Sequence, residues 1–252
     1  MIKAVDKAWK SGGFTFKNNS QSTTCRYSIV IPVLHEGDNI NKIIDFLQTI
    51  HDIESAEIIV VDGSPEKDTI ELIRSEEVIT MGSEKGRAVQ MNAGSRIARG
   101  EILLFLHADV IIPRDALSCI EEALADEDNV AGAFQLGIDS EKFMLKLIER
   151  FANYRSNVTG IPYGDQAIFI RKKIFINIGS FREIPIMEDL ELMERIRKSG
   201  HSMKIIPRKV ISSPRRWEKE GPLYGTFRNW IIRLLYHMGV EPESLIKYYK
   251  DN

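Results

Sequence analysis

Residues 102–109 of this 252-residue chain read ILLFLHAD, five apolar residues followed by His107, an alanine and Asp109. Two other runs follow the same plan: residues 29–36 (IVIPVLHE) end at a glutamate, and residues 58–62 (IIVVD) end at an aspartate. Runs this apolar are typical of strands buried on both faces of a parallel sheet. Because ligands bind outside the carboxyl ends of such strands, we expect the three acids to mark a site for a nucleotide, a metal ion or both.

The composition excludes several broad classes of protein. The chain is 43% hydrophobic and 28% charged with a net charge of -2, so nucleic acid is not an expected partner. The two cysteines, Cys25 and Cys119, have no metal-type spacing, which favours a reducing, cytoplasmic environment over a disulfide framework. The N-terminus does not read as a signal peptide, and no run of about 20 apolar residues predicts a membrane span.

Apolar residues at helical spacing alternate with the apolar runs. The patterns predict helices starting near Asp38, Arg87 and Asp115, and a short helix through residues 70–73. Strand, helix and strand in this order predict βαβ units with right-handed crossovers, and therefore an α/β fold. The later elements are expected as strands at residues 130–134, 167–170 and 204–206, and helices at 144–151 and 187–196.

Two segments of the first half could contact a nucleotide. Asp62 ends a strand and precedes Gly63, so its carboxylate could accept a hydrogen bond from a base, or it could cap a turn. Lys85 and Arg87 flank Gly86 before a helix, where cations and the helix N-terminus favour a diphosphate. The alternative for this second segment is a solvated loop.

The acid at the end of the third run points to a metal ion. A carboxylate after five apolar residues is costly to bury without a partner, and Mg²⁺ or Mn²⁺ on a diphosphate uses only one or two protein carboxylates. Asp109 is therefore the predicted metal ligand. His107 is either a second ligand, a hydrogen-bond donor or a structural residue.

Two segments of the second half carry further candidates. Glu188 and Asp189 open a helix that continues with more acids, which is more acidity than a helix N-terminus requires, so a general base is expected there. Arg215 and Arg216 precede Trp217, and paired guanidinium groups bind phosphate oxygens well. The alternative for these three residues is a basic surface with one buried aromatic anchor.

Taken together, the segments resemble the family-2 glycosyltransferases with a GT-A fold. The resemblance covers most of residues 27–248, and the chain is similar to a soluble bacterial subgroup described as radical-SAM/selenodomain-associated transferases. The matching segments are residues 28–36 (SIVIPVLHE), 57–64 (EIIVVDGS), 85–87 (KGR), 92–94 (NAG), 104–109 (LFLHAD), 164–166 (GDQ), 187–189 (MED) and 213–217 (SPRRW).

The resemblance implies a fold and its boundaries. A Rossmann-like nucleotide half, about residues 25–110, would join an acceptor half, about 111–210, around one mixed, mostly parallel sheet. Residues 1–24 are expected to be a flexible tail, and residues 211–252 a basic C-terminal helical segment.

The resemblance also implies roles for individual residues. Asp189, with Glu188, would be the catalytic base, and Asp109 the metal ligand. The loop at Tyr163, Gly164, Asp165 and Gln166 would lie on the acceptor side. The nucleotide sugar would be bound by Pro32, Val33, Glu36, Asp62, Lys85, Arg87, His107, Ala108, Asp109, Arg215, Arg216 and Trp217.

One position departs from the family pattern. The metal-binding motif of the family usually begins with aspartate, and this chain has His107 there. Imidazole suits Mn²⁺ better than Mg²⁺, so the expected cofactor is a divalent cation with a preference for Mn²⁺.

The implied activity is inverting transfer of a sugar from a nucleotide-diphosphate sugar, UDP-linked in most of the family, to an acceptor hydroxyl. A nucleotidyltransferase is the alternative enzyme, although residues 34–38 (LHEGD) are too acidic for its triphosphate loop, and a non-catalytic nucleotide-binding module is a third hypothesis. The basic and apolar stretch at residues 227–236 is expected to pack on the domain, to form a homodimer contact, or to lie on the inner face of the membrane.

Overall fold

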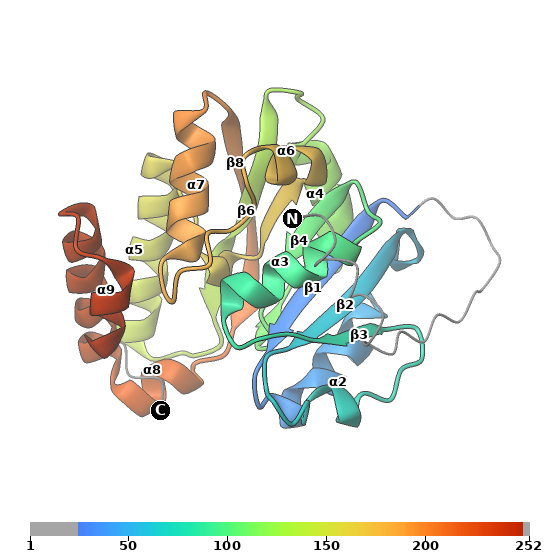
Figure 1. Cartoon of the computed structure of the whole chain (residues 1–252). Helices are drawn as coiled ribbons and strands as arrows, with labels where there is room; N and C mark the ends of the chain where they lie inside the picture. The colour runs from blue at the N-terminus through green and yellow to red at the C-terminus, as the bar shows by residue number, and fades with distance from the viewer. Residues whose placement is uncertain (1–24, 249–252) are drawn as a thin grey trace, which may run out of the picture.

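The computed structural model describes residues 25–248, and the predicted tail at residues 1–24 lies outside this range. Its strands form one eight-stranded sheet in the order β3-β2-β1-β4-β7-β6-β8-β5 (Figure 1). The strands, in chain order, are β1 (Tyr27–Val33), β2 (Ala56–Asp62), β3 (Ile79–Gly82), β4 (Ile102–Phe105), β5 (Val110–Ile111), β6 (Asn129–Ile138), β7 (Ile168–Arg171) and β8 (Ser202–Ser212).

The predicted mixed sheet is confirmed. β1 pairs in parallel with β2 and β4, β2 with β3, and β6 with β8, whereas β7 pairs antiparallel with β4 and β6, and β5 antiparallel with β8. The first half of the chain therefore contributes a parallel block, whose carboxyl ends meet at one edge, and β7 joins it to the second half.

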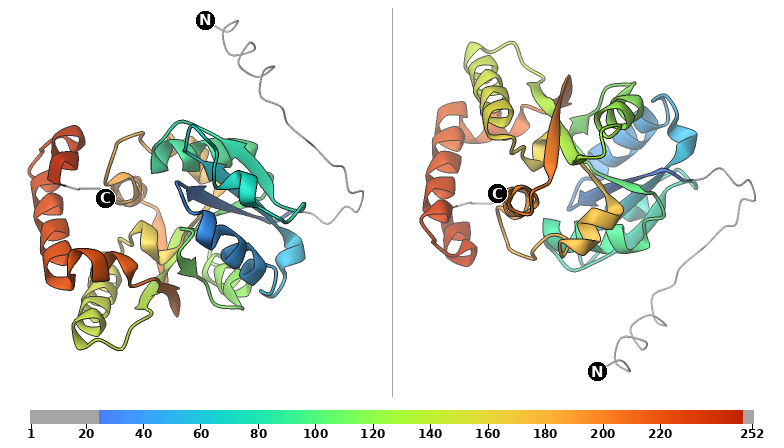
Figure 2. Two further views of the ribbon diagram at one scale, coloured as in Figure 1. Left: turned by 90° about the horizontal axis from the view of Figure 1, so that it is seen from below. Right: turned by 90° about the horizontal axis from the view of Figure 1, so that it is seen from above.

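Helices cover both faces of this sheet (Figure 2). On one face, α2 (Gly37–Leu47) and α4 (Ala116–Ala123) pack on β1 through alternate residues such as Ile29 and Ile31. On the other face, Val30 contributes to a second cluster with α3 (Arg87–Ile97), α6 (Lys172–Asn177) and α7 (Glu188–Lys198). Burial on both faces is the reason that the β1 sequence is continuously apolar.

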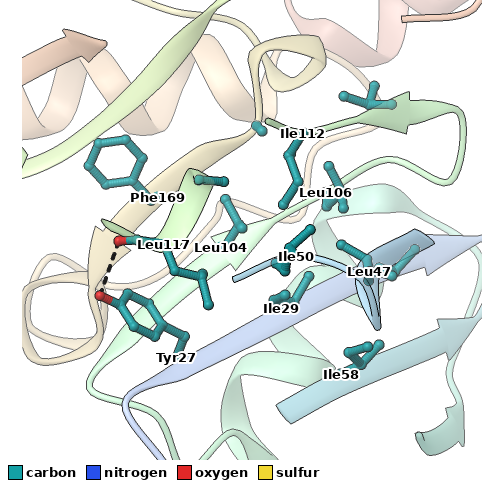
Figure 3. Close-up of a cluster of buried hydrophobic side chains, with 14 of the residues drawn as sticks. Tyr27, Ile29, Leu47, Ile50, Ile58, Leu104, Leu106, Ile112, Leu117 and Phe169 are labelled. Carbon is teal, nitrogen blue, oxygen red and sulfur yellow. Dashed lines mark hydrogen bonds between the residues drawn. The ribbon is translucent and has the colours of Figure 1, made fainter. Parts of the chain in front are cut away.

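The core on the α2 and α4 face includes the ring of Tyr27, whose hydrogen bond to Leu117 is drawn in Figure 3. The Tyr27 hydroxyl donates to the carbonyl oxygen of Leu117 at 3.2 Å and to Glu121 Oε2 at 2.8 Å. Burial raises the pKa of this hydroxyl above its ordinary value, and the hydrogen bond to Glu121 adds to the effect. The tyrosine thus fills the core with its ring while its polar atom keeps partners.

The remaining helices lie beside the second half of the sheet. They are α5 (Phe143–Thr159), α8 (Arg215–Glu220), α9 (Pro222–His237) and α10 (Pro242–Leu245). α9 packs against α5, and the two helices lie at the side of the molecule away from β3 (Figure 1). None of the helices in residues 25–248 is long and apolar enough to span a bilayer.

Some predicted elements differ in detail. The helix predicted near Asp38 begins at Gly37 with Glu36 at the N-cap, so Asp38 lies in the first turn, where its charge favours the helix dipole. The helix predicted at residues 70–73 is a single 3₁₀ turn, η2 (Ile70–Leu72). The strand predicted at residues 204–206 extends over β8 (Ser202–Ser212), because its pairing partner β6 is also long. The other 3₁₀ turns are η1 (Ile53–Ser55), η3 (Gly164–Gln166) and η4 (Ile246–Tyr248).

Candidate functional site

The carboxyl ends of β1, β2 and β3 are aligned at one edge of the sheet. Val33 is in register with Asp62, and Asp62 with Gly82. The buried amide of Gln90, from α3, donates to the carbonyl oxygens of Val33 at 2.7 Å and Val61 at 2.9 Å. Sequence analysis did not single out Gln90, because a lone glutamine in a helix has no distinctive pattern.

Asp62 is fully buried, and its carboxylate is bonded to the loop that follows β2. Oδ1 accepts from the backbone N–H of Ser64 at 2.8 Å, and Oδ2 from Thr69 at 3.0 Å and Ile70 at 3.2 Å. These contacts are those expected for the turn-capping alternative. Recognition of a base by Asp62 stays a prediction.

Pro32, Val33 and Ala108 have buried side chains. Contact of these three residues with a nucleotide sugar stays a prediction. Lys85 is exposed in the loop before α3, next to Gly86, which has a positive φ of 145°. That backbone conformation suits glycine, which is the N-cap residue of α3.

The C-terminal segment returns to this edge after β8. The backbone N–H of Ser213 donates to the carbonyl oxygen of Asp109 at 3.1 Å. Arg215 Nη2 then lies 3.6 Å from Oε2 of Glu36, the N-cap residue of α2. The predicted diphosphate-binding arginine is thus brought to the end of β1, where nucleotide contacts are expected.

Trp217 and Arg216 also lie in α8. Trp217 is half-buried against an apolar cluster made by Leu136, Ile138 and Leu145, so its contacts match the anchor alternative. The side chain of Arg216 lies outside the described part of the structure.

Asp189 and His107 flank one glycine. Asp189 Oδ2 accepts the backbone N–H of Gly164 at 2.6 Å, and Oδ1 accepts that of Leu190 at 2.7 Å. A Cβ built on Gly164 would lie 3.1 Å from His107 Nε2 and 3.4 Å from Asp189 Oδ2. The end of β4 and the start of α7 therefore meet at η3, as the predicted site requires.

The residue before Asp189 forms an ion pair with a residue of α3. Arg87 Nε lies 2.9 Å from Oε1 of Glu188, whose side chain is only 3% exposed. Burial raises the pKa of Glu188, and the neighbouring charge of Asp189 adds to this effect while Arg87 opposes it. Of the two predicted catalytic acids, Glu188 is thus the buried one.

The rest of the predicted acceptor loop divides into inner and outer residues. Gln166 is fully buried: its amide donates to the carbonyl oxygen of Phe134 at 2.8 Å and accepts the Tyr163 N–H at 3.1 Å. Its contacts hold the loop in place. Tyr163 and Asp165 are half-buried, and the ring of Tyr163 contacts two arginine side chains, Arg155 and Arg233, that sequence analysis missed.

The predicted metal ligands provide a small donor set. Asp109 offers a carboxylate and His107 an imidazole, and both side chains are half-buried. Within residues 25–248, no group of three or more His, Cys, Asp or Glu side chains is arranged to hold a metal ion. A carboxylate and an imidazole can serve as two ligands of a cation whose other ligands are phosphate oxygens and water.

Comparison with known proteins identifies the family. Residues 28–184, more than half of the chain, match the family model described as glycosyl transferase family 2. The chain belongs to this family. The glycosyltransferase match includes β1 to β4, with Asp62 and Asp109, and the loop at Gly164, but it ends before Asp189 and α8.

A solved structure supports the GT-A fold of this glycosyltransferase. The mannosyltransferase PcManGT from Pyrobaculum calidifontis, in complex with GDP-Man and Mn2+, matches all of this chain and 71% of its own, with a TM-score of 0.65 and 18% identity. No curated protein matches the chain. The GT-A expectation is thus confirmed, and the chain is a glycosyltransferase.

Proposed function

We propose that this glycosyltransferase moves a sugar, with inversion, from a nucleoside-diphosphate sugar to an acceptor hydroxyl. The observation that supports the proposal is the position of Asp189 at the start of α7, beside the loop at Gly164 and the end of β4. A carboxylate placed there can act as a general base toward an acceptor, while the donor occupies the edge formed by β1, β2 and β4.

In the proposed reaction, Asp189 accepts the proton of the acceptor hydroxyl as its oxygen attacks the anomeric carbon. The new C–O bond forms opposite the bond to the diphosphate, which breaks with its electron pair and leaves as a nucleoside diphosphate. Arg215, with Arg216, would stabilise the charge on this leaving group. Glu188 would act through its ion pair, which holds the start of α7 against α3.

A divalent cation fits this proposal as a cofactor shared with the donor. Asp109 and His107 would hold it, and when bound it would neutralise charge on the leaving diphosphate. The preference for Mn²⁺ over Mg²⁺ follows from the imidazole at position 107, and the bound Mn2+ named for the Pyrobaculum calidifontis mannosyltransferase supports a divalent ion in this fold.

The donor nucleotide is proposed to be UDP-linked on the basis of the family resemblance. The GDP-Man named for that mannosyltransferase makes GDP the main competitor. A panel of UDP, GDP, ADP and CDP, each with Mn²⁺, tests the choice by thermal shift, because the preferred nucleotide raises apparent stability most. If GDP gives the largest increase in melting temperature, the proposed donor is GDP-linked instead of UDP-linked.

Asp189→Asn tests the catalytic proposal. The amide cannot accept the acceptor proton, so we expect transfer to fall by about 10²–10⁴-fold, while donor binding stays within about twofold of the wild type. Asp45→Asn, on the exposed face of α2, is the matched change of one carboxylate and should transfer at the wild-type rate. Transfer by the Asp189 variant at near the wild-type rate would remove this residue from the role of base.

We further propose a peripheral contact with membrane lipids through α9. Leu223, Phe227, Trp230, Leu234 and Met238 recur at helical spacing and are between 52% and 71% exposed. α9 contains no acidic residue, and the Phe151 ring of α5 lies 6.4 Å from that of Trp230, which widens the apolar face. Exposed apolar patches of this kind mark interaction sites, and aromatic residues favour the bilayer interface.

Flotation with vesicles of phosphatidylcholine and phosphatidylglycerol tests this contact. We expect the wild type to float, and Leu234→Glu to stay in the soluble fraction. A wild type that does not float contradicts the membrane proposal. A concentration-dependent dimer that Leu234→Glu dissociates would assign the same face to a second copy.

A further inference from the structure

Two arginine side chains contact the ring of Tyr163 in the predicted acceptor loop. The Arg155 guanidinium carbon, from α5, lies 3.3 Å from the ring centroid, and that of Arg233, from α9, lies 4.7 Å from it. Arg233 Nη1 also donates to the Tyr163 hydroxyl. Two positive charges, one from α5 just before the loop and one from the distant helix α9, thus meet at one aromatic ring.

The two guanidinium groups donate only to neutral oxygen atoms in the described part of the chain. Arg155 donates to the carbonyl oxygen of Ile161 at 2.9 Å and to Gln166 Oε1 at 3.5 Å. Arg233 donates to the carbonyl oxygen of Asn229 at 3.2 Å besides the Tyr163 hydroxyl. Neither guanidinium group forms an ion pair with a carboxylate of residues 25–248.

Burial therefore disfavours the charged form of both arginines. Burial lowers the pKa of Arg155 to about 10, against the opposing charges of Asp165 and Asp189. Burial also lowers the pKa of Arg233 to about 10, and the charge of Arg155 adds to that effect. Both groups stay protonated near neutral pH, and both side chains remain partly accessible, so an anion that reaches them would relieve the repulsion.

The position of the pair relates it to the proposed reaction. Tyr163 precedes Gly164, whose N–H is bonded to the proposed base Asp189. The charge of Asp189 is also close enough to affect the pKa of Arg155. The arginines thus lie at the predicted acceptor loop and near the proposed base, whereas Arg215, a candidate for the donor diphosphate, lies at the end of β1.

We propose that Arg155 and Arg233 form a subsite for a phosphate group carried by the acceptor. The proposal rests on the proposed function, because it orients an acceptor toward Asp189. Guanidinium groups bind phosphate oxygens in bidentate geometry, and a phosphate dianion matches two neighbouring cations better than a single carboxylate does. Tyr163 keeps both guanidinium planes in place, so less side-chain entropy is lost on binding.

Inorganic phosphate is the direct probe of this subsite. In thermal-shift titrations at constant ionic strength, with chloride as the reference anion and UDP and Mn²⁺ present throughout, phosphate should stabilise the wild type saturably. Arg155→Gln and Arg233→Gln should each weaken phosphate binding about tenfold or more, since each loses charge-assisted hydrogen bonds. Arg150→Gln, an exposed arginine on the same helix α5, is the matched control and should bind phosphate like the wild type.

The outcomes distinguish this subsite from phosphate binding elsewhere on the protein. No saturable effect of phosphate on the wild type overturns the proposal without any variant. Equal phosphate binding by the wild type and both glutamine variants also overturns it, because phosphate then binds at another place, for example at the donor site. If either glutamine variant fails to fold, Arg233→Lys keeps the charge but loses the planar fork, and unchanged phosphate affinity in it would contradict bidentate binding.

A second arm identifies the source of the phosphate and tests transfer. Paired acceptors that differ only in the phosphate are compared in the wild type: polyprenyl phosphate with polyprenol, and glycerol 3-phosphate with glycerol. We expect kcat/KM to be at least tenfold higher for the phosphorylated member of one pair, which distinguishes a lipid from a small-molecule source. Equal transfer to both members would keep the proposed function and overturn the subsite. If phosphate binds through both arginines but no nucleotide sugar binds, the subsite is supported and the proposed function is contradicted.

Discussion

Arg87, in the first turn of α3, and Glu188, in the first turn of α7, form an ion pair with 2.9 Å between Nε and Oε1. α3 leads back to β4 in the first half of the sheet, and α7 leads into β8 in the second half. Within the described residues, Glu188 Oε2 is buried without a hydrogen-bond partner. The pair therefore joins the two halves directly beside Asp189, and its stability depends on the charge of one buried carboxyl group.

Arg87→Met should make the fold sensitive to pH. The pKa of Glu188 is already raised, mainly by burial, and loss of Arg87 raises it further. A carboxyl group with a raised folded-state pKa is harmless below its unfolded value, about 4.3, and destabilises the fold as the pH rises through the folded value. We expect a loss of about 2–3 kcal/mol at pH 8, less than for a fully buried pair because Arg87 is 40% exposed, and clearly less at pH 5.

Urea denaturation of the wild type and of Arg87→Met at the two pH values measures this difference. Arg96→Met removes a more exposed arginine of the same helix, 3.6 Å from Glu183, and should cost less than about 1 kcal/mol at both pH values. Equal losses for Arg87→Met at pH 5 and pH 8 would mean that the charge of Glu188 is not involved.

The strands of the sheet could be predicted from the sequence because their signal is local. Burial of both faces requires consecutive apolar residues, so the runs ending at Val33, Asp62 and Phe105 mark β1, β2 and β4 directly. The predicted edge follows from parallel pairing. An acidic residue that directly follows such a run is predicted to lie at this edge, but the sequence does not predict what its carboxylate contacts.

The side-chain partners could not be predicted, because no local sequence pattern marks them. Nothing near Gln90 indicates that its amide bridges two strand ends, and nothing near Arg155 or Arg233 indicates a shared ring at Tyr163. The role of Asp62 could not be predicted either, since turn capping and base recognition both require an aspartate at the end of β2.

Gly164→Ala should impair transfer more than stability. The backbone of Gly164 does not have a positive φ, so alanine is allowed there, but its Cβ would lie 3.1 Å from His107 Nε2 and 3.4 Å from Asp189 Oδ2. Displacement of Asp189 by a few tenths of an ångström should lower kcat about tenfold, since catalytic geometry tolerates little misplacement. Steady-state kinetics tests this against Gly225→Ala in α9, where the new Cβ would lie 3.0 Å from Glu220 Oε2 and would meet neither His107 nor Asp189. Unchanged kcat for Gly164→Ala would show that the base has room to move.

Asp62→Asn should separate turn capping from base recognition. The carboxylate accepts three backbone N–H groups, and an amide nitrogen in place of one oxygen would face a donor, so we expect a loss of about 1–3 kcal/mol in unfolding free energy. If the residue only caps the loop, calorimetry should show binding of all nucleoside diphosphates weakened by a similar factor. A changed order of preference among the bases would instead support direct recognition. Asp45→Asn, on the exposed face of α2, is the matched control.

His107→Asp should change which metal ion supports transfer. An imidazole at this position favours Mn²⁺, whereas a second carboxylate beside Asp109 supplies the oxygen ligand that Mg²⁺ prefers. We therefore expect the ratio of kcat/KM with Mn²⁺ to that with Mg²⁺ to fall by about tenfold or more in the variant. Asp109→Asn should remove most of the response to either ion, because only His107 remains as a protein ligand. Metal titrations of transfer rate, started from protein treated with EDTA, measure both effects. If the wild-type transfer rate is the same with and without EDTA, the proposed metal-binding role of Asp109 and His107 is contradicted.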